Sequence, residues 1–163
     1  MQTVVLYDAA CGTSGHVARA VARTLEPFGP VRVLHGAFLA QRDALLEADL
    51  IVVGAPTHGH LEKVHHLQRL IERLPPGALE GKLAVAFDTW RPGAKWMMGS
   101  AANGLAQRLR SKGAHVISPP TSFMASEGPG AILHGELRRA GTWAINFAGR
   151  ALGTRPRPYG SSS

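Results

Sequence analysis

The sequence predicts an α/β protein built on a doubly wound parallel sheet of five strands, with helices on both faces of the sheet. Two observations lead to this fold class. Five short apolar or β-branched runs recur along the chain, and at least three are apolar nearly throughout, as strands buried on both faces must be. Helical patterns lie between these runs, so strands and helices alternate along the whole chain.

The predicted strands, in chain order, are residues 3–7, 31–35, 50–54, 83–87 and 115–118. The first helix is expected directly after the first strand and its loop, because Val17, Val21 and Leu25 recur at i, i+4 and i+8. Arg19 and Arg23 fall on the opposite side of that helix. This spacing predicts one buried and one solvated helix face.

A second apolar stripe predicts another helix, which Pro75 and Pro76 end. Its members are Val64, Leu67, Leu70, Ile71 and Leu74. Further helices are expected at about residues 39–47, 100–112 and 135–152. No internal repeat is present, so residues 1–152 are interpreted as one domain and residues 153–163 as a disordered basic tail.

Five strands in a doubly wound sheet commonly take the order 2-1-3-4-5. In such sheets ligands bind outside the carboxyl ends of the strands, where the winding reverses between strands 1 and 3. This rule selects two loops, residues 8–16 and 55–60, both rich in small, hydroxyl or imidazole side chains. We therefore expect the functional site at these two loops.

Composition restricts the class of protein. The single cysteine, Cys11, excludes an internal disulfide and fits a reducing compartment. The apolar start of the chain is too short for a signal peptide or a membrane span, so a cytoplasmic protein without a membrane partner is expected. The 18 Lys and Arg exceed the 11 Asp and Glu and give a net charge of +7. Such a charge allows nucleic acid, an acidic protein partner or an anionic cofactor. Because the cations are scattered over several predicted helices, a solvated basic surface is expected and nucleic acid is disfavoured.

The first loop does not match three known motifs. A thiol phosphatase needs Arg six positions after Cys11, where Val17 stands. The nucleophile elbow G-x-S-x-G fails at His16, and the dinucleotide fingerprint G-x-G-x-x-G fails at Ser14 and Val17. What remains is a Gly-Thr-Ser turn that enters a helix N-terminus, where backbone N–H groups and the helix dipole suit a phosphate group. The alternative is that Thr13 or Ser14 only caps the helix.

From residue 3 to residue 152 the sequence resembles the flavodoxin family. "VVLYDAACGTSGHVARAVA" is similar to that family's first strand, phosphate loop and first helix. "ADLIVVGAPTHGH" and "LAVAFDTWRPGAKWMMGSAANGLAQRLRSKGAHVISPP" resemble the segments that carry its two flavin-side loops, and "EGPGAILHGELRRAGTWA" resembles the entry to its last helix. The resemblance implies a flavodoxin-like fold, the cofactor FMN and an electron-transfer function with a protein redox partner.

The resemblance also implies which residues bind FMN. They are Ala9, Ala10, Cys11, Gly12, Thr13 and Ser14 in the first loop, Pro56, Thr57, His58, Gly59 and His60 in the second, and Asp88, Thr89 and Trp90 after the fourth strand. The family's phosphate loop carries hydroxyls at its first, third and last positions, where this chain has Ala9, Cys11 and Ser14. Each missing hydrogen bond costs roughly 0.5–1.5 kcal/mol, so weaker FMN binding than in a full loop is expected.

Several of these residues have a second interpretation. Trp90 is expected to stack on the flavin ring, or else to pack the base of its loop. Asp88 and Thr89 are expected to orient the loop backbone, to bond the ribityl chain, or to form an Asx-type turn. The alternatives to an electron carrier are a small FMN-dependent quinone or NAD(P)H reductase and an interaction module without cofactor.

Four histidines close together, His58, His60, His65 and His66, raise the question of a metal site. No cysteine accompanies them, and Glu62 is the only nearby carboxylate. We interpret these imidazoles as solvated or at the edge of a bound flavin, and we expect neither a metal site nor a catalytic nucleophile or base.

Overall fold

The computed structural model describes residues 1–8, 13–36, 41–57, 66–91, 100–126 and 131–154. The elements in this part of the chain are β1 (Thr3–Tyr7), α1 (Thr13–Leu25), the 3-10 helix η1 (Glu26–Phe28), β2 (Val31–His35), α2 (Gln41–Glu47), β3 (Leu50–Pro56), α3 (His66–Glu72), β4 (Leu83–Trp90), α5 (Ala101–Ser111), β5 (His115–Val116), β6 (Thr121–Met124) and α6 (Glu136–Thr154). The predicted alternation of strands and helices is confirmed.

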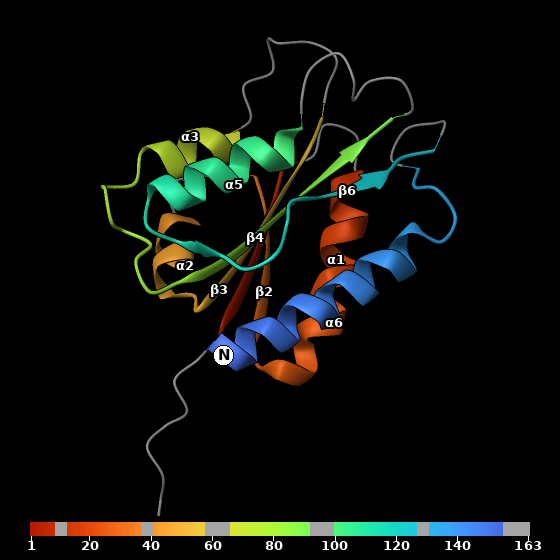
Figure 1. The fold of residues 1–163 in the computed structure, drawn as a ribbon. Helices are drawn as coiled ribbons and strands as arrows, with labels where there is room; N and C mark the ends of the chain where they lie inside the picture. Colours follow the sequence, from red (N-terminus) through yellow and green to blue (C-terminus); the bar gives the residue numbers. More distant parts are fainter. Residues whose placement is uncertain (9–12, 37–40, 58–65, 92–99, 127–130, 155–163) are drawn as a thin grey trace, which may run out of the picture.

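The sheet has the predicted strand order β2-β1-β3-β4-β5, and these strands pair in parallel. Helices α1 and α6 lie on one side of it, and α2, α3 and α5 on the other (Figure 1). Each side has its own apolar core, because successive residues of a buried strand point to opposite faces. The fold class derived from the apolar runs is therefore confirmed.

A sixth strand, β6, follows β5 and adds to the five predicted strands. Strand β6 pairs in parallel with β4 through Phe87↔Thr121 to Trp90↔Met124, on the edge where β5 pairs with the beginning of β4. Pro119 and Pro120 stand just before β6. Because proline has no N–H to donate to a strand ladder, the edge strand is interrupted there and divides into β5 and β6.

The core beneath α6 joins that helix to β4 and β6. The aromatic rings of Phe87, Phe123, Trp143 and Phe147 pack edge to face, with centroids 4.7–6.1 Å apart between neighbours. Gly54 on β3 makes room for this cluster, because a Cβ there would lie only 2.0 Å from Cζ of Phe87. Ring packing and a glycine thus fix α6 against the sheet.

Helix α6 is the last element that the structure describes. Helix α6 continues to Thr154, two residues past the predicted end of the domain at residue 152, and residues 155–163 of the expected tail lie outside the described part of the chain. Within the part that the structure describes, no helix has both the length and the apolar character that crossing a membrane requires.

Candidate functional site

The carboxyl ends of β1, β3 and β4 lie side by side, because these three strands are neighbours in a parallel sheet. The predicted residues Thr13, Ser14, Pro56, Thr57, Asp88, Thr89 and Trp90 are described there. The predicted residues Ala9, Ala10, Cys11, Gly12, His58, Gly59 and His60 lie outside the described residues, so their assignment stays a prediction.

Ser14 and Thr89 connect the first turn of α1 to the end of β4. Their hydroxyl oxygens lie 2.9 Å apart, and the two residues are 1% and 3% exposed. A hydroxyl has one O–H donor, so one of the two is used within the pair and the other remains to donate outside it. Thr13 is also buried, and its hydroxyl donates to the carbonyl oxygen of Ala131 at 3.4 Å.

Side chains from the ends of β3 and β4 cap the N-terminus of α5 by accepting hydrogen bonds from its first N–H groups. The Thr57 hydroxyl accepts from the Ala101 N–H at 3.1 Å, and Oδ2 of Asp88 accepts from the Ala102 N–H at 3.1 Å. Ser100 is the N-cap, accepts from the third amide of the helix at 3.4 Å, and donates its own hydroxyl to Oδ2 of Asp88. Because the first amides of α5 already have partners, this helix end is not available to an anion.

Asp88 is 1% exposed, and its second oxygen, Oδ1, has no hydrogen-bond partner among the described residues. Asp8, one residue beyond β1, has a comparable role, since its Oδ2 accepts from the His66 N–H at the start of α3 at 3.0 Å. Asp8 thus receives an amide from the helix that follows the neighbouring strand β3, and Asp88 receives one from the helix that follows its own strand. Asp8 lies in the predicted loop 8–16 but was not among the predicted binding residues, although its position at the end of a buried strand was a usable signal.

The N-terminus of α1 differs from that of α5 in charge. Neither helix has an acidic residue in its first turn, but the Asp88 carboxylate bonds the start of α5, whereas a guanidinium lies beside the start of α1. The Arg19 guanidinium reaches back along the helix, and a Cβ built on Gly15 would lie 3.2 Å from Nη1 of Arg19 and 3.0 Å from Cε2 of Tyr7. The helix dipole, the hydroxyls and this guanidinium together make the end of α1 suited to a negatively charged group.

Trp90 is the last residue of β4 and is half-buried. Its carbonyl oxygen accepts from the Ala125 N–H at 2.8 Å, so its backbone is held by the chain that follows β6. The alternation of a strand places its side chain on the same face as Asp88, towards α5. Stacking of this ring on a flavin remains a prediction.

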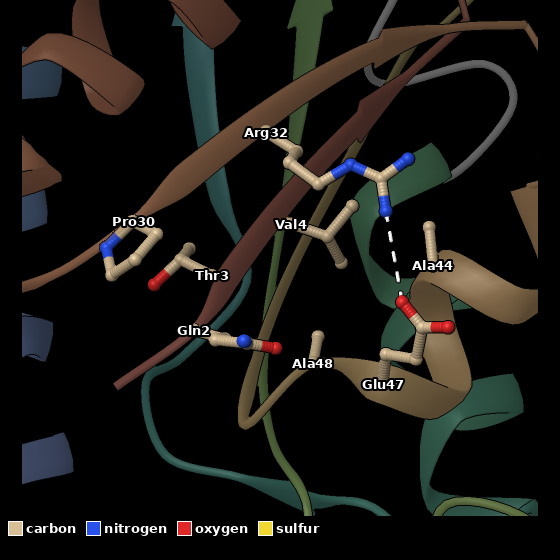
Figure 2. A pocket seen from close by; sticks show the side chains of 8 residues that line it. All are labelled: Gln2, Thr3, Val4, Pro30, Arg32, Ala44, Glu47 and Ala48. Atoms are coloured by element: carbon tan, nitrogen blue, oxygen red, sulfur yellow. Dashed lines mark ion pairs between the residues drawn. The ribbon is translucent and has the colours of Figure 1, made fainter.

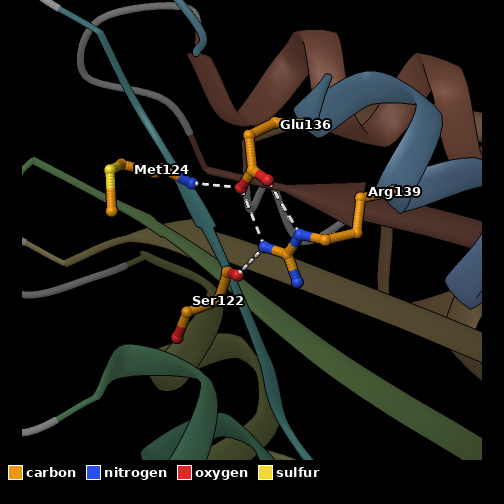
Figure 3. Close-up of polar contacts among 4 residues, drawn as sticks. All are labelled: Ser122, Met124, Glu136 and Arg139. Carbon is orange, nitrogen blue, oxygen red and sulfur yellow. Dashed lines mark hydrogen bonds and ion pairs between the residues drawn. The ribbon is translucent and has the colours of Figure 1, made fainter. Parts of the chain in front are cut away.

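Glu136 and Arg139 of α6 cover the outer edge of β6 (Figure 3). Oε2 of Glu136 accepts from the Met124 N–H at 2.7 Å, and Arg139 donates to the Ser122 carbonyl and to both oxygens of Glu136. The same guanidinium lies 4.5 Å from the centroid of the Phe123 ring. Hydrogen bonds from Arg139 hold the pKa of the Glu136 carboxyl below its ordinary value, and Glu136 in turn raises the pKa of Arg139.

A separate cavity of about 140 Å³ lies at the opposite end of the sheet, where β1 and β2 begin (Figure 2). Residues from both strands and from α2 line it, and Arg32 faces Glu47 across it at 3.8 Å. None of the predicted site residues lines this cavity. It is therefore not part of the site at the carboxyl ends of the strands.

Comparison with known proteins identifies the fold. No family model matches the chain, and no curated protein matches it. Among solved structures, flavodoxin 2 from Bacillus cereus is similar with a TM-score of 0.76 and 18% identity, over 92% of this chain and 99% of that one. The Streptococcus pneumoniae TIGR4 flavodoxin gives a TM-score of 0.73 and 19% identity, over 92% and 99%.

A third solved structure, the flavodoxin, WrbA-like protein from Agrobacterium tumefaciens, gives a TM-score of 0.70 and 21% identity, over 94% of this chain and 99% of that one. The similarity spans nearly the whole of each chain. The fold is flavodoxin-like, as the resemblance of the sequence implied.

Proposed function

We propose that this protein binds FMN at the carboxyl ends of β1, β3 and β4 and acts as an electron carrier. The observation that carries the proposal is the buried Ser14–Thr89 hydroxyl pair, which joins the N-terminus of α1 to the end of β4. A doubly wound sheet binds its ligand outside the carboxyl ends of the strands, where the winding reverses between β1 and β3, and β4 is the neighbour of β3. The flavodoxin-like fold supports the same assignment. FMN, when bound, supplies reversible electron transfer.

In this proposal the chain's own residues anchor and orient the cofactor. The N-terminus of α1 binds the phosphate, and the O–H that the Ser14–Thr89 pair does not use internally donates to it. Arg19 adds positive charge beside Gly15. The amides of α5 are already bonded to Thr57, Asp88 and Ser100, so they do not compete for the phosphate.

The same network holds the strand ends rigid around the site. The Thr57 N–H donates to the Thr89 carbonyl oxygen at 2.8 Å, which joins the ends of β3 and β4. Asp8 and Asp88 fasten the starts of α3 and α5 to β1 and β4. A site held by rigid elements needs little rearrangement on binding or on electron transfer.

The experiment is a comparison of FMN with riboflavin, each titrated into the protein and followed by quenching of flavin fluorescence. Because riboflavin lacks the phosphate, FMN is expected to bind at least about tenfold more tightly, which corresponds to ~1.4 kcal/mol. Inorganic phosphate should compete with FMN and leave riboflavin binding unchanged. Equal affinities would contradict the phosphate site, and absence of binding would favour an interaction module without cofactor.

A further inference from the structure

We propose that the outward face of α6, with the adjoining face of α1, is a docking surface for an acidic protein partner. Five large apolar side chains are exposed among the described residues, and four of them lie on α6 or one turn before it. They are Leu133, Leu137, Ile145 and Leu152, with exposed fractions of 40–57%. The proposal does not depend on FMN binding.

These side chains form one stripe along α6. Leu137, Ile145 and Leu152 are spaced by eight and seven residues, which places them on one side of a helix of 3.6 residues per turn. The opposite side of α6 is already buried against the sheet through Trp143 and Phe147. A surface helix is normally apolar on one side only, so the second apolar side indicates a partner.

Glycines lie between the exposed apolar side chains of α6. Gly141 and Gly149 flank Ile145 one turn before and one turn after it. A Cβ built on Gly149 would meet nothing within 4 Å, and one on Gly141 would meet only Oγ1 of Thr24, at 3.3 Å. Partner backbone can therefore approach α6 closely beside Gly149, whereas Gly141 faces Thr24 of α1.

A hollow of about 450 Å³ lies next to the apolar stripe at the N-terminal end of α6. Ile132, Leu133 and Leu137 line it with apolar groups, and His134 and Arg138 line it with groups that carry or can carry positive charge. An apolar centre with a polar rim is the usual anatomy of a protein–protein interface. The hollow can receive a large apolar side chain of the partner.

Charge determines which kind of partner fits. Helices α1 and α6 carry Arg19, Arg23, Arg138, Arg139 and Arg150. The one carboxylate of these two helices, Glu136, turns inward to Met124 and Arg139, and its side chain is only 14% exposed. Arg139 is paired with Glu136 at 2.8 Å. The helices on the other side of the sheet carry more carboxylates, Asp43 and Glu47 on α2 and Glu72 on α3. A second copy of this chain would bring Arg23, Arg138 and Arg150 against their like, whereas an acidic surface complements them.

The test uses a defined probe, an amphipathic helical peptide of leucine and glutamate, with its leucine and lysine counterpart as control. Binding to the whole protein is measured by calorimetry at low and at high salt. The glutamate peptide is expected to bind more weakly at high salt, because screening weakens attraction between exposed charges. The lysine peptide is expected not to bind.

Two variants with matched controls locate the binding surface. Ile145→Thr and Arg138→Ser should each weaken binding of the glutamate peptide, Ile145→Thr by about tenfold, or ~1.4 kcal/mol. Val33→Thr, at the exposed apolar residue of β2, and Arg69→Ser, on α3, should leave binding unchanged. All four side chains are exposed, so folding is expected to be retained and is checked by circular dichroism.

Three results would overturn the proposal. They are absence of binding, equal binding of both peptides, and binding that Ile145→Thr does not alter. A second copy of this chain is the alternative partner, and analytical ultracentrifugation of the protein alone tests it. A dimer that Ile145→Thr dissociates would assign this face to self-association. FMN titration of Ile145→Thr should match the wild type, which separates failure of the docking surface from failure of the proposed FMN site.

Discussion

The hydroxyl oxygens of Ser14 and Thr89 lie 2.9 Å apart in the interior of the molecule, although the residues are separated by 75 positions in the chain. Either hydroxyl can donate to the other. The pair fastens the start of α1 to the end of β4, and it presents one further O–H to whatever binds between them. In the proposed FMN site, the same two side chains therefore anchor these elements and recognise the ligand.

The first prediction follows from this pair. Ser14→Ala and Thr89→Val should each weaken FMN binding, by roughly 0.5–1.5 kcal/mol, because each removes one hydroxyl from the pair. The double variant should lose less than the sum of the two, since the residues act on FMN together. Flavin fluorescence titration measures the three affinities.

Thr121→Val is the control for these variants. Thr121 is the first residue of β6, and its hydroxyl donates to the Pro119 carbonyl oxygen. It takes no part in the Ser14–Thr89 pair, so FMN affinity should not change. Additive losses in the double variant would mean that Ser14 and Thr89 contribute separately, and unchanged affinity in both single variants would return the pair to a structural role.

The second prediction concerns the N-terminus of α5. Asp88→Ala should lower the free energy of unfolding by about 2 kcal/mol, because it removes a buried cap of the helix and a partner of Ser100. Asp88→Asn should cost less, since the amide oxygen can still accept the Ala102 N–H. Urea denaturation measures both, with Asp43→Ala, at an exposed carboxylate of α2, as the control. Equal stability of Asp88→Ala and Asp43→Ala would show that the cap contributes little.

The sheet could be predicted from the sequence because parallel strands buried on both faces appear as unbroken apolar runs. Strands β1, β3 and β4 are of this kind, and their order then located the site. Strand β6 was missed because its four residues follow two prolines and are only partly apolar. The sequence TSFM shows neither a run nor a clear alternation, and its pairing with β4 is a tertiary contact.

The roles of individual site residues were harder to predict. Thr57 and Asp88 were expected near the cofactor, but their hydroxyl and carboxylate oxygens bond amides of α5 that are 44 and 14 positions away. No local pattern indicates a helix cap supplied by another strand. The same reason explains why Asp8, whose partner is 58 positions away at His66, was not selected.

The third prediction concerns Trp90. If its ring stacks on the flavin, bound FMN should quench tryptophan emission, and Trp90→Phe should remove most of that quenching. Trp90→Ala should weaken FMN binding by up to about tenfold, since aromatic stacking contributes ~0.5–1.5 kcal/mol beyond area burial. Trp143 provides an internal reference, because its ring lies in the core beneath α6 and its Nε1 donates to the Ser118 hydroxyl at 3.3 Å. Quenching that persists in Trp90→Phe would assign Trp90 to packing of the strand end.

The fourth prediction concerns pH and the closure of the β6 edge. The pKa of Glu136 is held below its ordinary value of 4.5 by hydrogen bonds from Arg139, so the folded state binds this proton less readily than the unfolded chain. The stabilisation is therefore fully present above pH 4.5 and is lost as the pH falls through the lowered pKa of the folded state. Glu136→Gln should lower the free energy of unfolding at neutral pH by about 1 kcal/mol, a modest value because Arg139 is half exposed.

Urea denaturation at a series of pH values checks this assignment. The difference in stability between wild type and Glu136→Gln should be constant near neutrality and should shrink below pH 4.5, because protonation removes the charge of Glu136 in the wild type as well. Glu80→Gln is the control, since Glu80 is an exposed carboxylate outside the β6 edge and its substitution should give a small difference at every pH. A difference for Glu136→Gln that stayed constant down to acid pH would show that its charge does not stabilise the edge.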